Sequence, residues 1–238
     1  MPGQCRLCEA TLRGFTWAPV CDSCLAAARP SRAANFCEHC GLPFETNAPL
    51  HGGLTCALCR ADPPAFDAAR SGGIFDGNYR RLIHLLKYDG MRPLARPLAA
   101  WTAEVMPALG RVDLLLPVPL HWTRRVKRGF NQAELFAREL SKITGIPVDA
   151  RALRRTRATQ SQAGLSRRQR RENLRGVFAV TDAARVRGRS VAVIDDVMTT
   201  GTTVAACARA LKKASAGRVT ALTAARVKRR VLEWNDSA

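Results

Sequence analysis

The sequence lacks both a long apolar run and a leader-like start. Among its 238 residues, no stretch approaches the roughly 18 to 20 consecutive apolar residues that a membrane-spanning helix needs. The opening segment MPGQCRLCEA lacks the basic start and the continuous apolar core of a signal peptide. Hydrophobic residues still make up 47% of the chain, enough to bury a core. We therefore expect a folded cytoplasmic protein that does not insert into membranes.

Acidic residues are also scarce. The chain has 19 Asp and Glu against 38 Lys and Arg, which gives a formal net charge of +19. Residues 1–60 hold five basic and four acidic residues, whereas residues 121–190 hold 18 and five, a balance of +13. A field concentrated in this way attracts polyanions, either diphosphates or nucleic acid. We favour a functional basic face over a solvated surface, because solvated surfaces usually mix both signs.

Cysteine is nearly confined to the start of the chain. Eight of the nine cysteines form four Cys-x-x-Cys pairs within residues 5–59, and the ninth, Cys207, is expected to be a small core residue. In a reduced compartment such pairs indicate metal binding rather than disulfides. Twelve residues separate the first two pairs and 15 the last two, a spacing typical of Cys₄ zinc sites. The predicted zinc ligands are Cys5, Cys8, Cys21, Cys24, Cys37, Cys40, Cys56 and Cys59.

These cysteines predict two structural Zn²⁺ ions. Four thiolates leave no open coordination position, so the zinc is not expected to be catalytic. Its binding would supply folding energy that so short a module cannot draw from a core. Pairing across the two halves, or a single occupied site, remains open at this stage. A redox role is disfavoured because it does not explain four pairs in succession. His39 and His51 are potential substitute ligands, but the number of cysteines makes them unnecessary.

The rest of the chain alternates strands and helices. Four short apolar runs are typical of buried strands, at residues 112–118, 177–180, 191–194 and 219–227. Helices are predicted over residues 80–88, 94–108, 131–143 and 203–215. The arginine-rich segment 151–176 contains no convincing strand. This alternation predicts an α/β fold with a doubly wound, mostly parallel sheet.

One segment has the residue types of a sugar-phosphate site. The strand at 191–194 leads into Asp195 and Asp196, then into a turn of Thr and Gly that opens a helix. Such a strand delivers the carboxylates to its carboxyl end, where open α/β sheets bind ligands. Main-chain N–H groups, hydroxyls and the helix dipole suit a phosphate, and Gly201 permits a conformation that a side chain would block. The acid pair suits a ribose diol, with Mg²⁺ relieving the remaining charge.

The segment VAVIDDVMTTGTT, residues 191–203, resembles the phosphoribosyl diphosphate (PRPP) motif of type I phosphoribosyltransferases. It is neither a P-loop nor a dinucleotide-binding fingerprint. Upstream, residues 115–140 and 155–178 resemble the ComF/GntX family of competence-associated, phosphoribosyltransferase-like proteins. Together with the cysteine-rich start, the resemblance covers nearly the whole chain.

This resemblance implies a domain plan and a set of ligand contacts. It implies a double zinc ribbon over residues 1–60 and a type I phosphoribosyltransferase fold over 61–238, with 61–110 as a hood or linker. The acid pair would hold the ribose hydroxyls, the threonine loop the 5′-phosphate and the loop after Pro117 the diphosphate. The residues thus assigned to Mg-PRPP are Asp195, Asp196, Thr199, Thr200, Gly201, Thr202, Thr203, Pro119, Arg124 and Arg128. No residue is assigned to catalysis, and Asn131 either caps a helix or contacts ligand.

The arginines between residues 154 and 175 have two interpretations. They lie where type I enzymes carry a mobile loop that closes over PRPP and excludes water. They also form a track suited to a nucleic-acid backbone. Arg167, Arg170 and Arg171 lie at helical spacing, so they can share one face. Few aromatic residues accompany them, which favours phosphate contact over base stacking.

Two main functions compete. The family resemblance implies a factor that binds PRPP and incoming single-stranded DNA in natural transformation, alongside proteins of DNA uptake or recombination. The alternative is an active Mg-PRPP-dependent phosphoribosyltransferase of nucleotide metabolism or salvage. Residues 61–110 show no acceptor signature, which weighs against a known salvage reaction. A sensor that binds PRPP without consuming it is a third hypothesis.

Overall fold

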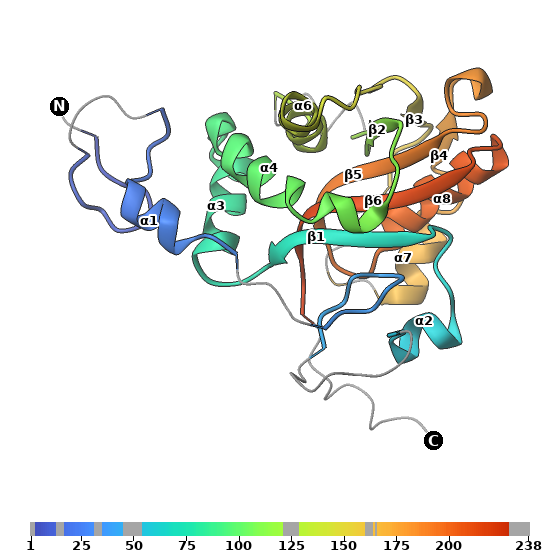
Figure 1. The fold of residues 1–238 in the computed structure, drawn as a ribbon, viewed down its shortest axis with the longest axis horizontal. Coiled ribbons are helices and arrows are strands. Elements are labelled where there is room, and N and C mark those ends of the chain that lie inside the picture. Colours follow the sequence, from blue (N-terminus) through green and yellow to red (C-terminus); the bar gives the residue numbers. More distant parts are fainter. Residues whose placement is uncertain are drawn as a thin grey trace.

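A four-stranded parallel sheet forms the centre of the molecule (Figure 1). The computed structural model describes residues 3–12, 17–30, 35–44, 54–120, 129–159, 164 and 166–228, with only the main chain of Arg167. The strand order is β1 (Ala68–Ile74), β6 (Arg218–Arg226), β5 (Ser190–Met198) and β2 (Leu114–Pro117). A parallel bridge between Leu115 and Val148 extends the β2 edge. The predicted α/β fold with a parallel sheet is confirmed.

The central strands are apolar because both of their faces are covered. On β5, Ala192 and Ile194 belong to the core under one helical layer, whereas Val191 and Val193 belong to the core under the other. All four side chains are fully buried. Continuous apolar runs of this kind are typical of parallel strands with helices on both faces.

Helices form a layer on each side of the sheet (Figure 1). One layer contains α3 (Gly77–Tyr88), α4 (Ala95–Ala103) and α6 (Gln132–Thr144), and the other contains α7 (Arg167–Asn173) and α8 (Thr202–Lys213). Asn131 caps α6 through its side chain, as predicted. Short 3₁₀ turns occupy Arg92–Leu94, Met106–Leu109 and Ala183–Arg185. The helix predicted over 94–108 divides into α4 and a 3₁₀ turn, because Pro107 has no N–H to continue the α-helix.

The sequence interpretation missed the edge strand β1. Its sequence, AARSGGI, is poor in β-branched residues and contains Gly72 and Gly73, which weaken a strand signal. The structure explains one of these glycines: a Cβ on Gly72 would lie 2.3 Å from Thr102 Oγ1 on α4. Gly72 therefore allows α4 to pack closely against the sheet.

The strand predicted at 177–180 is present but lies outside the main sheet, and one prediction about the neighbouring arginine-rich segment was wrong. The apolar run at 177–180 forms β4 (Phe178–Val180), but β4 pairs antiparallel with β3 (Leu153–Arg155) in a separate two-stranded sheet. β3 lies in the arginine-rich segment that was expected to contain no strand. Only Leu153 of its three residues is buried, so it carries almost no apolar pattern.

The cysteine-rich segments lie on two sides of the main domain (Figure 1). The first includes α1 (Asp22–Ala27) and shares a buried core with α3, through Leu7 and Leu12. The second includes α2 (Ala57–Ala61) and lies near α7. The division of the chain at residue 60 stays a prediction. Among the described residues, no helix is long and apolar enough to cross a membrane.

Candidate functional site

The predicted phosphate loop connects β5 to α8. The strand continues through Met198, so Asp195 and Asp196 lie in its last four residues rather than after it. Gly201 is the residue before α8 and has a φ of 75°, in the left-handed region that favours glycine. A Cβ there would also lie 3.1 Å from Met198 Cε and 3.6 Å from the Phe66 ring. Glycine is thus favoured at position 201 by its backbone conformation, and a side chain there would also have to displace the Met198 methyl group.

Threonine hydroxyls line this loop. The Oγ1 atoms of Thr200 and Thr202 share a hydrogen bond of 2.7 Å, and Thr199 Oγ1 accepts one of 3.2 Å from Arg170. Thr202 and Thr203 form the first turn of α8, a 12-residue helix with no acidic residue in that turn. The loop therefore combines hydroxyl groups with the positive end of a helix dipole, as a phosphate site requires.

The two carboxyl groups at the end of β5 differ in environment. Asp196 Oδ1 forms a 2.9 Å ion pair with Lys87 Nζ from the last turn of α3, and both side chains are less than a fifth exposed. Asp195 has no basic partner among its hydrogen bonds in the described part of the chain. Burial, followed by the neighbouring charge of Asp196, raises the pKa of the Asp195 carboxyl to about 7. The pair thus holds less than two full negative charges near neutral pH.

No feature of the sequence singled out Lys87. A lysine in the last turn of a helix usually complements the helix dipole and attracts no notice. Its approach to Asp196 depends on how α3 packs on the sheet, so only the tertiary structure reveals it. Lys87 is the basic group that faces the acid pair within the described residues.

The loop after β2 also reaches this edge of the sheet. Val118 N donates to Ile194 O at 2.9 Å, which places Pro119 near the end of β5. Asn131 Nδ2 donates to Val118 O at 3.1 Å while its Oδ1 accepts from Ala133 N, so Asn131 both caps α6 and holds this loop. Arg124 and Arg128, the predicted diphosphate contacts, lie outside the described residues.

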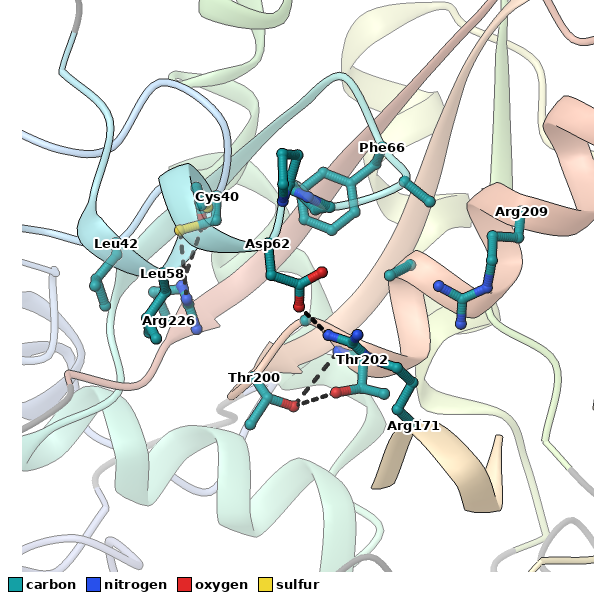
Figure 2. A pocket seen from close by; sticks show the side chains of 16 residues that line it. Cys40, Leu42, Leu58, Asp62, Phe66, Arg171, Thr200, Thr202, Arg209 and Arg226 are labelled. Carbon is teal, nitrogen blue, oxygen red and sulfur yellow. Dashed lines mark hydrogen bonds and ion pairs between the residues drawn. The ribbon is translucent and has the colours of Figure 1, made fainter. Parts of the chain in front are cut away.

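Three arginines lie near the phosphate loop, on the side that faces the second cysteine module (Figure 2). A cavity of about 90 Å³ lies between the loop and the second cysteine module, and Arg171, Arg209 and Arg226 contribute to its lining. Arg171 forms an ion pair with Asp62. Arg226 lies under the loop and donates hydrogen bonds to the carbonyl oxygens of Met198 and Thr199. The sequence interpretation assigned no role to Arg209 or Arg226.

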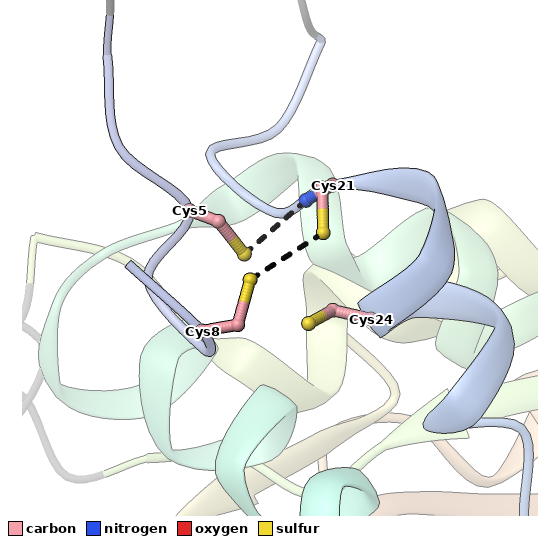
Figure 3. A group of neighbouring side chains, drawn as sticks. All are labelled: Cys5, Cys8, Cys21 and Cys24. Atoms are coloured by element: carbon pink, nitrogen blue, oxygen red, sulfur yellow. Dashed lines mark hydrogen bonds between the residues drawn. The ribbon is translucent and has the colours of Figure 1, made fainter. Parts of the chain in front are cut away.

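The eight predicted ligands form two separate Cys₄ clusters, the first drawn in Figure 3. Cys5, Cys8, Cys21 and Cys24 make one cluster, and Cys37, Cys40, Cys56 and Cys59 make the other, with all Sγ atoms of a cluster within 4.8 Å of one another. Pairing across the two halves is therefore wrong for these residues. Neither His39 nor any carboxylate joins the clusters within the described chain.

The sulfur geometry fits zinc. Tetrahedral Zn–S bonds of about 2.3 Å place two sulfurs roughly 3.8 Å apart. The Sγ atoms of Cys8 and Cys21 are 3.7 Å apart, and those of Cys40 and Cys56 are 3.8 Å apart. Main-chain N–H groups of Cys21 and Cys56 point at the sulfurs of Cys5 and Cys37, which suits thiolates. By contrast, Cys207 is fully buried in the core, and burial raises the pKa of its thiol.

Comparison with known proteins identifies relatives over nearly the whole chain. Residues 112–238 match the phosphoribosyl transferase domain family. The DNA utilization protein YhgH of Escherichia coli O157:H7 is 36% identical over 225 residues, which cover 92% of this chain and 95% of that protein. Competence protein F of Haemophilus influenzae is 30% identical over 197 residues, covering 80% of this chain and 84% of that protein. The chain belongs to the ComF family.

The match to the phosphoribosyl transferase domain family confirms the predicted type I fold for this ComF protein. Glutamine PRPP amidotransferase from Bacillus subtilis, a solved structure, is 21% identical, with a TM-score of 0.38 over 55% of this chain and 26% of that chain. The two Cys₄ clusters fit the double zinc ribbon expected at the start of a ComF protein.

Proposed function

We propose that this ComF protein binds Mg-PRPP at the carboxyl end of β5 and handles single-stranded DNA during DNA uptake. The observation that carries the PRPP part is one contiguous unit: the acid pair, the threonine loop and the start of α8. The carboxylates are suited to accept hydrogen bonds from the ribose diol, and the loop is suited to hold the 5′-phosphate. Bound Mg²⁺ would neutralise part of the diphosphate charge.

The same proposal assigns the diphosphate to the loop after β2. Pro119 stands at the start of that loop, and Arg124 and Arg128 supply the charge that a diphosphate needs. Lys87 joins this set because its ammonium already lies beside the acid pair. A ligand that brings its own metal ion and hydroxyls would compete with Lys87 for Asp196.

Single-stranded DNA is the partner that the basic surface supports. Relatives of this chain are named for DNA utilization and competence. Among the described side chains of residues 151–175, six arginines are exposed, namely Arg151, Arg154, Arg157, Arg168, Arg171 and Arg175. They suit a phosphate backbone, and the scarcity of aromatic residues nearby favours weak sequence preference. We place zinc in both cysteine clusters as structural support.

An active phosphoribosyltransferase is the second candidate, and the acid pair favours it. Two carboxylates repel a polyanion, so DNA binding alone does not explain Asp195 and Asp196 at this edge. In such a transfer a nitrogen nucleophile forms a bond to the anomeric carbon of PRPP. The bond from that carbon to diphosphate breaks, and diphosphate leaves with the electron pair. The proton of the nucleophile passes to solvent or to a base.

One titration series tests the proposal. The purified full chain is titrated with Mg-PRPP and with labelled single-stranded DNA, and Asp195→Ala/Asp196→Ala serves as the control. We expect PRPP to bind the parent chain and not the double variant. Equal binding to both would overturn the site assignment, and DNA binding that is absent or insensitive to salt would remove the DNA part. Release of diphosphate in the presence of candidate nitrogen acceptors would favour the enzyme over the binding protein.

A further inference from the structure

Arg226 joins the second cysteine cluster to the phosphate loop. It ends β6, and its side chain is buried, with only 4% of the residue exposed. Its Nε donates to Cys40 O at 3.2 Å, and its Nη1 donates to Met198 O at 2.9 Å and also to Thr199 O. Its Nη2 lies 3.8 Å from Cys40 Sγ. One guanidinium therefore holds a cysteine of the cluster and the first residue of the loop at the same time.

A second connection reaches the same loop from the other side of the cluster. Cys59 lies in α2, and Asp62 directly follows that helix and pairs with Arg171 of α7. The preceding residue of α7, Arg170, donates to Thr199 Oγ1 at 3.2 Å. Figure 2 shows Cys40 and Asp62 on one side of the cavity, with Arg171, Thr200 and Thr202 on the other. Both connections end on Thr199.

The first cysteine cluster makes different contacts. Within the described residues, its module meets α3, where Arg81 Nη2 donates to Leu7 O at 2.8 Å and Arg6 pairs with Asp89 at 3.5 Å. Its other ion pair, between Arg29 and Glu104, lies just beyond α4. The hydrogen bonds and ion pairs described for this module do not reach residues 198–203.

We propose that the second cysteine cluster, through Arg226, sets the conformation of the phosphate loop. Four thiolates around one Zn²⁺ carry a net negative charge, which compensates a buried guanidinium that pairs with carbonyl groups. Bound zinc would hold Cys40 in place, Cys40 contacts Arg226, and Arg226 holds the carbonyl groups of Met198 and Thr199. The conformation of the loop thereby depends on metal in the second cluster, whereas the first cluster connects to α3, whose Lys87 pairs with Asp196 rather than with the loop. This inference deepens the proposed function and rests on it for the identity of the anion.

Matched cysteine variants test the connection. Cys56→Ser/Cys59→Ser disrupts the second cluster, and Cys21→Ser/Cys24→Ser makes the equivalent change in the first. Zinc content, Mg-PRPP affinity and hydrogen exchange of residues 198–203 and 77–88 are measured on the full chain. We expect each variant to lose one zinc. The second-cluster variant should lose protection at 198–203 and about tenfold or more in PRPP affinity, whereas the first-cluster variant should lose protection mainly at 77–88.

Arginine variants separate Arg226 from the general integrity of the module. Arg226→Lys keeps the charge but cannot form the planar fork that reaches both Cys40 and the loop. We expect it to retain both zinc ions while losing protection at 198–203 and PRPP affinity. Arg70→Lys is the control, because Arg70 also donates to this module, at Glu38 O, but does not contact the loop. Asp62→Asn, a milder surface change, should give a smaller loss in the same direction.

The outcomes distinguish the two proposals. If the parent chain binds no PRPP, the proposed ligand is wrong, and loop protection alone then decides the coupling. If Cys56→Ser/Cys59→Ser loses its zinc but keeps both loop protection and PRPP affinity, the coupling is overturned. Equal loss of loop protection in both cysteine variants would also overturn it.

Discussion

Lys87 Nζ lies 2.9 Å from Asp196 Oδ1 and ties the last turn of α3 to the carboxyl end of β5. The pair is mostly buried, so its charges are screened less than those of a surface pair. It also lies beside Asp195. Burial and the charge of Asp196 raise the pKa of Asp195, and the positive charge of Lys87 acts against this increase. One lysine thus supports an acid pair that would otherwise repel itself.

Replacing Lys87 should therefore destabilise the protein when both carboxyls are ionised. At pH 8 we expect Lys87→Met to lower the free energy of unfolding by about 1 to 3 kcal/mol, because Asp196 loses its partner next to Asp195. The control is Lys142→Met, which breaks a pair with Glu139 in which the lysine is exposed, and it should cost less than about 1 kcal/mol. Urea unfolding of both variants at pH 8 provides the comparison, and equal losses would contradict the role of Lys87.

The raised pKa of Asp195 predicts how stability depends on pH. Its usual pKa of 3.8 applies in the unfolded chain, and its folded pKa is about 7. The folded protein therefore holds the proton more tightly, and this contribution is complete below pH 4 and is lost as the pH rises through 7. Asp195→Asn does not ionise, so its stability relative to the parent should rise between pH 4 and pH 7 and level off above.

The size of that difference is bounded. A shift of roughly three pKa units corresponds to at most about 4 kcal/mol. Urea unfolding of parent and Asp195→Asn at pH 5, 6, 7 and 8 measures it. A difference in unfolding free energy that stays constant across this range would show that the Asp195 carboxyl titrates normally.

The role of Gly201 in ligand binding can be separated from the cost of backbone strain. Gly201→Ala should destabilise the protein by about 1 to 2 kcal/mol, because alanine is strained at a φ of 75° and meets Met198 Cε. Gly188→Ala, at a φ of 69° with open space around the position, should cost about 1 kcal/mol. Only Gly201→Ala should weaken Mg-PRPP binding, by about tenfold or more. Calorimetric titration checks this, and a similar loss in Gly188→Ala would assign the effect to stability.

Zinc should be present in both clusters. Metal analysis of the full chain is expected to find about two zinc ions per chain, as two Cys₄ sets imply. Removal by a strong chelator should lower the thermal midpoint, because metal binding contributes folding energy. Cys207→Ser is the control and should keep the full zinc content. One zinc in the freshly purified parent chain would count against two complete sites.

Exposed arginines should determine the salt dependence of DNA binding. Substituting alanine at Arg154, Arg168 and Arg175 should reduce the slope of log affinity against log salt by about 2 to 3, if each contacts one phosphate. A control with the same change in charge substitutes arginines outside this segment, namely Arg29, Arg111 and Arg138. Fluorescence anisotropy measures the DNA affinity of both sets of variants over roughly 50 to 300 mM salt. Equal slopes in the two sets would place the DNA elsewhere.

Several features of this protein follow from the amino-acid sequence alone. The Cys-x-x-Cys pairs and the strand–loop–helix unit at 191–203 are short stretches in which neighbouring residues impose the geometry. Residue type and spacing therefore identify the eight cysteine ligands, the acid pair and the candidate phosphate loop, whereas the division of the cysteines into two clusters came from the structure. The apolar runs of β2, β5 and β6 predict these strands just as directly, because strands buried on both faces need apolar residues throughout.

Only the tertiary structure decided what supports these features. Asp62 and Arg171 are 109 residues apart in the chain, and Cys40 and Arg226 are 186 apart. β1 escaped prediction because two glycines interrupt its strand pattern, and one of them, Gly72, serves the packing of α4. Such contacts depend on how helices and modules pack on the sheet, and each basic side chain looks like an ordinary surface residue in the sequence. The candidate phosphate loop is therefore a local property of the chain, whereas the residues that hold it in place are a property of the fold.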